Sequence, residues 1–136
     1  MFGFRFTIRS RRILTGAWLM YWAAMAVATH LPVPEGLRIP IREGDKLLHM
    51  LMYFVLTMLG GRVILTATAT PTLRRLAAWA LVYTVYGAID EALQPLVGRH
   101  ASVQDWIANV FGILLASSIL STQLNREQEG TDDAAR

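Results

Sequence analysis

The sequence predicts an all-α membrane protein, a bundle of four transmembrane helices with the N- and C-termini in the cytoplasm. Hydrophobic residues make up 54% of the 136 residues and charged residues 17%, whereas soluble domains usually carry about 25% charged residues. The mean hydropathy is +0.37. Four apolar runs of 18 or 19 residues are each long enough to cross a hydrocarbon core. Basic residues gather at the ends of these runs.

The first apolar run follows a basic segment. Met1–Arg12 contains four arginines and no acidic residue, and Ile13–Leu31 continues for 19 residues without a formal charge. A basic start before an apolar run is also typical of a cleaved signal peptide. The length of the run favours a retained transmembrane helix. So do Pro32, Pro34 and Glu35, which follow it in place of a clear small-residue cleavage site.

Three further spans are predicted at Leu47–Leu65, Leu76–Leu93 and Val103–Leu120. The turn at Pro95–Ser102 is short, so the last two helices should lie side by side and antiparallel. Residues 122–136 are polar and rich in Glu, Asp, Gln and Arg, which predicts a disordered cytoplasmic tail. The transmembrane domain is therefore expected at residues 1–121.

The basic residues predict how the chain is oriented in the membrane. With the N-terminus inside, nine of the 13 basic residues fall on the inner side, and four fall on the outer side. The outer four are Arg38, Arg42, Lys46 and Arg99. This distribution follows the positive-inside rule, so loops 32–46 and 94–102 should face away from the cytoplasm.

Composition excludes several classes of function. The chain has no cysteine, which rules out a disulfide framework and a thiolate metal site. The net charge of +3 does not indicate nucleic-acid binding, because the arginines lie at segment ends rather than on one amphipathic face. We expect no cofactor and no bound metal, since His49 is the only histidine expected inside the pocket described next and His100 lies on a loop.

Polar residues interrupt the apolar runs in one layer. Glu91 shares a helical face with Gly87, and Asn109 lies one turn after Asp105. In the predicted orientation these residues and His49 come together near the outer surface. Ionisable groups inside a span are costly, and they usually face the bundle interior and pair. The residues expected to line this pocket are Asp45, His49, Tyr53, Glu91, Gln94, Arg99, Asp105 and Asn109.

A purely structural role for these residues stays open. Polar side chains near helix ends often lie there because water is near, and this applies above all to Asp45. Arg99 is the expected counter-charge for Glu91 or Asp105, and such a pair would hold three helices in register without any ligand.

The polar residues also form an ordered set of motifs. In chain order they are Asp45-Lys46-x-x-His49-x-x-x-Tyr53, Asp90-Glu91-x-x-Gln94, Gly98-Arg99 and Asp105-x-x-x-Asn109-x-x-Gly112. The set resembles the VanZ-like family of small bacterial integral membrane proteins over about residues 45–116. Ala116 stands where such proteins often have a second glycine. Gly112 and Ala116 still offer a face of small residues for helix packing.

The resemblance implies a multi-pass protein of the bacterial inner membrane with a role in the cell envelope, in a family whose biochemical activity is mostly unassigned. The namesake of the family is associated with reduced susceptibility to teicoplanin, a lipid-tailed glycopeptide antibiotic. That association does not by itself assign glycopeptide resistance to this chain.

We favour a binding or accessory function. The outward-facing polar pocket would recognise a lipid headgroup, a lipophilic glycopeptide, a lipid-linked envelope molecule or a protein partner. Arg99 would bind an anionic group, while Gln94 and Asn109 would supply neutral hydrogen bonds.

Two alternatives remain open. A membrane hydrolase or transferase acting on a lipid-linked substrate would use His49 and Glu91 or Asp105 as acid and base, or as ligands of a divalent metal. A structural or transporter subunit is the other alternative. Four short spans would form a transporter only as a homo-oligomer or with other proteins.

Overall fold

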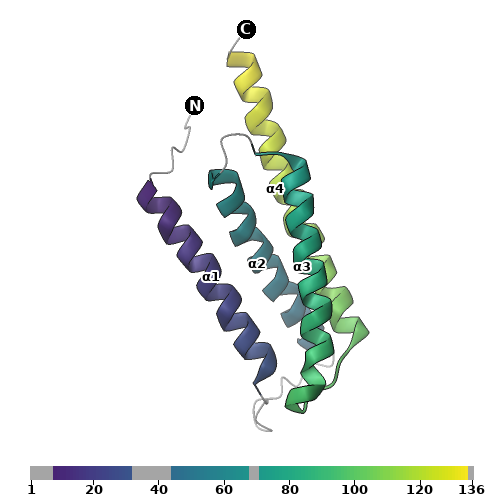
Figure 1. Cartoon of the computed structure of the whole chain (residues 1–136). Coiled ribbons are helices and arrows are strands. Elements are labelled where there is room, and N and C mark those ends of the chain that lie inside the picture. The colour runs from purple at the N-terminus through teal and green to yellow at the C-terminus, as the bar shows by residue number, and fades with distance from the viewer. Residues whose placement is uncertain (1–7, 32–43, 68–70, 135–136) are drawn as a thin grey trace.

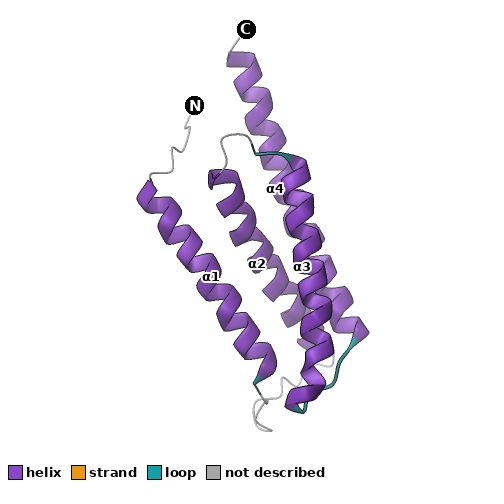
Figure 2. Ribbon diagram, viewed as in Figure 1, coloured by secondary structure: helices purple, strands orange, loops and turns teal. Residues whose placement is uncertain are grey.

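The computed structural model describes residues 8–31, 44–67 and 71–134, and these residues form helices, turns and loops with no strand (Figure 2). The elements are α1 (Ile8–His30), α2 (Gly44–Ala67), α3 (Leu73–Leu93), the short 3-10 helix η2 (Gln94–Val97) and α4 (Val103–Ala134). The predicted all-α fold class is confirmed.

The four long helices run alternately up and down (Figure 1). The start of α1 and the end of α4 lie at one end of the molecule. At the other end α1 and α3 finish and α2 and α4 begin, and η2 lies there as well. This second end is called the η2 end below. The predicted antiparallel arrangement of the last two helices is confirmed.

Three helical segments are long and apolar enough to cross a membrane: Gly44–Ala67, Leu73–Val97 and Val103–Asp133. Each contains one of the predicted spans and is longer than the prediction. The 23 residues of α1 are also enough to cross a hydrocarbon core. However, α1 is not among the three segments that are both long and apolar enough. Its two tryptophans and one tyrosine carry polar ring atoms, which make the helix less apolar.

Helix α2 packs most extensively against α4. A Cβ atom added to Gly112 of α4 would collide with the backbone carbonyl oxygen of Met50, so the two backbones lie close together. One turn further along α4, Ala116 is fully buried. Small residues at these two positions allow the close approach, as their spacing predicts.

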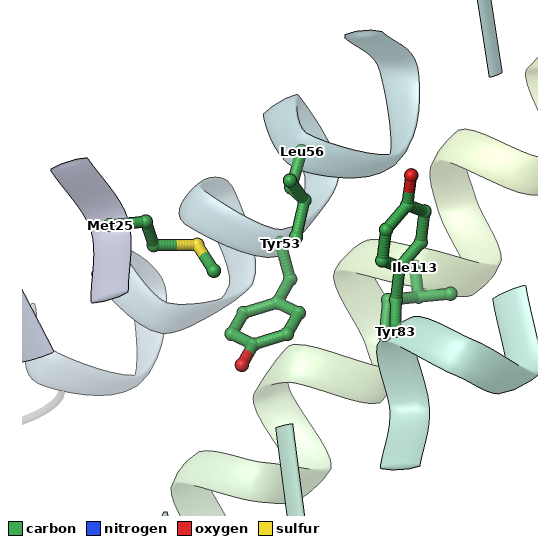
Figure 3. Close-up of a cluster of buried hydrophobic side chains, with 5 residues drawn as sticks. All are labelled: Met25, Tyr53, Leu56, Tyr83 and Ile113. Carbon is green, nitrogen blue, oxygen red and sulfur yellow. The ribbon is translucent and has the colours of Figure 1, made fainter. Parts of the chain in front are cut away.

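Aromatic rings join α1 to α3. Trp18 and Trp79 meet edge to face with centroids 5.6 Å apart, and Trp22 meets Tyr83 in the same way at 5.4 Å. Such T-shaped pairs are the preferred aromatic geometry. The core cluster drawn in Figure 3 takes side chains from all four helices: Met25, Tyr53, Leu56, Tyr83 and Ile113. Thus α1 belongs to the same packed bundle.

The end of the chain differs from the prediction. The sequence predicts a disordered tail from residue 122, but α4 continues to Ala134, and its last turns extend beyond the other helices (Figure 1). Leu124 is 1% exposed and packs with Leu76 and Leu120. Beyond Leu124, Glu, Gln and Arg are good helix formers. Extending an existing helix avoids the cost of nucleation. The prediction of disorder, which was based on polarity alone, is therefore wrong for this segment.

Candidate functional site

His49 lies at the junction of three helices at the η2 end. Its side chain is 4% exposed. The Nδ1 atom lies 3.2 Å from Asn109 Oδ1 on α4 and 3.4 Å from Glu91 Oε1 on α3. One imidazole thereby links α2, α3 and α4 through polar contacts.

Glu91 connects this junction to the start of α4. Its Oε2 atom accepts a hydrogen bond from the backbone N–H of Ser102 at 3.2 Å. The Ser102 hydroxyl in turn accepts from the N–H of Asp105 at 3.2 Å, which is the bond of a helix N-cap. Glu91 is 5% exposed. Its carboxylate is therefore held by the loop between η2 and α4 as well as by His49.

Two aspartates also lie near the imidazole. Asp45 Oδ1 is 4.0 Å from His49 Nε2, and the Asp45 side chain is 64% exposed. Asp105 is 8% exposed. One ligand atom from each of Asp45, His49 and Asp105 lies within 4.8 Å of the other two. The histidine therefore has polar neighbours along both edges of its ring.

A second polar cluster attaches the end of α1. Asp90 Oδ1 accepts a hydrogen bond from the Thr29 hydroxyl at 2.9 Å and lies 3.5 Å from His30 Nδ1. Asp90 is 2% exposed and Thr29 is 3% exposed. All four helices therefore contribute polar side chains to the η2 end.

Arg99 lies elsewhere than predicted. In the described part of the chain it forms no ion pair with Glu91 or Asp105. Its Nη1 atom donates to the backbone carbonyls of Ala28 at 3.3 Å and Thr29 at 3.2 Å. The last carbonyls of a helix have no partner within it and carry partial negative charge, so the end of α1 attracts a guanidinium group.

Several polar atoms in or beside these clusters are buried and have no hydrogen-bond partner among the described residues. They are Tyr53 Oη, Asp90 Oδ2, Glu91 Oε1, Gln94 Nε2 and Asn109 Nδ2. Buried polar groups are nearly always paired with protein or water, and leaving one unpaired is costly. The η2 end therefore has hydrogen-bonding capacity that its own side chains do not use.

A pocket of about 270 Å³ opens beside Glu91. Its walls come from the end of α3, the following loop and the start of α4. The lining residues are Ala88, Glu91, Ala92, Ala101, Ser102, Val103 and Trp106. Glu91 is the one charged residue among them, so this pocket offers a carboxylate within mostly small, apolar walls.

Most residues predicted to line a pocket lie at the η2 end. Asp45, His49, Glu91, Asp105 and Asn109 cluster directly. Tyr53 and Gln94 are 0% and 2% exposed, and Arg99 is turned toward the end of α1.

The residues predicted to line the pocket do not include Thr29, His30, Asp90 or Ser102, although Asp90 belongs to the motif set. The available signal was that Thr29 and His30 end the first helix at the same level as the other polar groups.

Comparison of the chain with family models, curated proteins and solved structures found no match. The function must therefore be argued from the geometry of the η2 end.

Proposed function

We propose that this chain is a VanZ-like protein of the bacterial cytoplasmic membrane in which all four helices span, both termini are cytoplasmic and the η2 end faces outward. Three helices of sufficient length and apolarity support the proposal. The rings and the Thr29–Asp90 hydrogen bond that join α1 to α3 support including α1 as the fourth span. The excess of basic residues at the opposite end supports the orientation.

The proposed activity is binding of an amphiphile, the polar head of a lipid or lipid-linked envelope molecule, in the pocket beside Glu91. The observation that carries it is the Glu91 carboxylate: the residue lines an otherwise mostly apolar pocket, and its Oε1 is buried without a hydrogen bond. Val103, which lines the pocket, is 73% exposed. It would offer an apolar surface to the tail of the same ligand.

The charges favour a head that donates hydrogen bonds. The charged group at the pocket is a carboxylate, and Arg99 is engaged by carbonyls of α1. A carboxylate binds an ammonium or hydroxyl group through a charge-assisted hydrogen bond. This chemistry favours a zwitterionic, amine-bearing headgroup over a purely anionic one. A lipophilic glycopeptide with a free amine would present the same groups.

The test compares phosphatidylethanolamine with phosphatidylglycerol. The purified full chain in detergent should retain more phosphatidylethanolamine, counted as bound lipid by native mass spectrometry. Ala92→Leu would fill the pocket and should abolish this preference. Ala24→Leu, at an exposed alanine of α1, should keep it.

Equal retention of both lipids by the wild type, or an unchanged preference in Ala92→Leu, would overturn the proposed binding activity. The observation that supports the membrane-enzyme alternative is the 3.4 Å contact between His49 and Glu91. The two side chains are close enough to act as an acid–base pair. Release of a water-soluble headgroup during the incubation would favour that alternative over simple binding.

A further inference from the structure

The start of α2 and the start of α4 bring together three side chains that ligate metals in other proteins. Asp45 is the second residue of α2, Asp105 is the third residue of α4, and a ring nitrogen of His49 lies within 4.8 Å of a carboxylate oxygen of each. Carboxylates in the first turn of a helix are favourable without any ligand, because the helix dipole attracts them. That effect explains the two aspartates. It does not explain the nearly buried imidazole of His49, whose Nε2 lies 4.0 Å from Asp45 Oδ1.

The contacts of Nδ1 determine which nitrogen of His49 is available. Its two neighbours are Glu91 Oε1 and Asn109 Oδ1. An amide oxygen only accepts hydrogen bonds, so Nδ1 carries the proton and donates to Asn109. In the neutral imidazole the lone pair is then on Nε2, the nitrogen that faces Asp45 at 4.0 Å. Metal-binding histidines are commonly oriented in this way, with the other ring nitrogen donating to a carboxylate or a carbonyl.

The charges at this point also favour a cation. Asp45 and Asp105 bring two negative charges to one imidazole, and Glu91 adds a third carboxylate on the far edge of the ring. Like charges repel more strongly where water is scarce, as it is around the buried Asp105 and Glu91. A divalent ion bound by two aspartates and a neutral histidine would form a site without net charge.

We propose that Asp45, His49 and Asp105 bind a divalent transition-metal ion, Zn²⁺ or Mn²⁺, at the η2 end. An imidazole nitrogen with two carboxylates suits these ions, whereas Mg²⁺ and Ca²⁺ prefer oxygen ligands alone. The site lies outside the pocket beside Glu91 and requires no lipid. It therefore stands or falls independently of the proposed binding activity.

The geometry requires only a small adjustment. Metal–ligand distances of about 2.0–2.2 Å bring neighbouring ligand atoms to about 3.0–3.5 Å from one another. The present separations are at most 4.8 Å. Asp45 is mostly exposed, so its side chain is free to rotate inward. Its exposure also gives ions a route from solvent to the site.

The experiment measures metal binding by the full chain in detergent. The protein is stripped with a chelator and dialysed against Zn²⁺, Mn²⁺, Mg²⁺ or Ca²⁺. Bound metal is then counted by mass spectrometry, and affinity is measured by dye competition. The wild type should bind one Zn²⁺ or Mn²⁺ per chain. Asp45→Asn and Asp105→Asn should each weaken binding by at least about tenfold, since losing even a supporting residue costs about 10- to 100-fold.

Two controls separate loss of a ligand from loss of fold. Asp132→Asn removes an exposed carboxylate at the far end of α4, and His100→Ala removes an exposed loop histidine. Both should bind as the wild type does. Because Asp45 is exposed, Asp45→Asn should fold even if Asp105→Asn does not.

Wild-type affinity in Asp45→Asn would overturn the metal site, leaving an ion-paired histidine. Failure of the wild type to bind either ion, or binding of Mg²⁺ or Ca²⁺ alone, would also overturn it.

Discussion

At the scale of single residues, Asn109 helps to set the orientation of the His49 imidazole. Asn109 is fully buried, and its Oδ1 accepts from His49 Nδ1. The amide therefore helps to hold the ring in the orientation that turns Nε2 toward Asp45. Loss of this amide should weaken function more than stability, because hydrogen bonds between membrane helices contribute on average only about 0.6 kcal/mol.

Replacing Asn109 with Leu tests this difference. Leucine keeps the number and branching of the side-chain heavy atoms, so the folded yield in membranes should change little. The affinity for Zn²⁺ should fall by about 10- to 100-fold, the usual effect of removing a group that orients a ligand. Asn125→Leu, at an exposed position of α4, is the control and should change neither quantity. Equal affinity in the two variants would show that Asn109 does not orient the ring.

The sequence allowed good predictions for residues whose partners are set by helical spacing. Glu91, Asp105 and Asn109 were placed together because periodicity puts them on inward faces near one loop. Arg99 was misplaced because its partners are backbone carbonyls at the end of α1. Every residue carries such a carbonyl, so no side-chain pattern marks them. Thr29 escaped notice because a lone threonine near a helix end is common in any sequence.

At the scale of elements, Gly112 sets the distance between α2 and α4. Gly112→Ala would place a Cβ against the Met50 carbonyl oxygen, and backbone cannot move aside as a flexible side chain can. We expect a loss of about 1–3 kcal/mol, the usual cost of overpacking, seen as a lower melting temperature in detergent.

The matched control for that variant is Gly16→Ala on α1. A Cβ added there has no neighbour within 4 Å. In the interior of a helix, alanine is better than glycine by about 1 kcal/mol, so this variant should melt at the wild-type temperature or above. Equal melting temperatures for the two variants would refute the close-approach argument.

Element boundaries were predictable only where composition changes sharply. The predicted spans lie within the helices, but α2 and α3 each begin three residues earlier, at Gly44 and Leu73. Hydropathy detects the apolar middle of a helix and not the polar turns that continue its hydrogen bonding. The same limitation hid the last turns of α4.

At the scale of the whole molecule, the proposed orientation makes a prediction about each loop. Reporters active only outside the cytoplasm should be active when fused after Leu37 or after Gly98, and inactive when fused at Pro71. The physical reason is the nine-to-four distribution of basic residues. Enzyme activity in intact cells, corrected for the amount of each fusion protein, is the measurement.

The opposite reporter pattern would mean that the η2 end faces the cytoplasm. The pocket would then not face outward. Activity after Gly98 without activity after Leu37 would mean that α2 and α3 do not both span. In either case the metal site would remain testable, because it depends on the contacts among Asp45, His49 and Asp105 and not on which side they face.

Helix α4 is longer than the hydrocarbon core of a membrane is thick. Its 32 residues measure about 48 Å at 1.5 Å per residue, whereas the hydrocarbon core is about 30 Å thick. If the first turn, with Asp105, lies near one membrane surface, about a third of the helix stands in water beyond the other. A molecule that binds those last turns would hold the same rigid helix whose opposite end carries Asp105, about eight helical turns away.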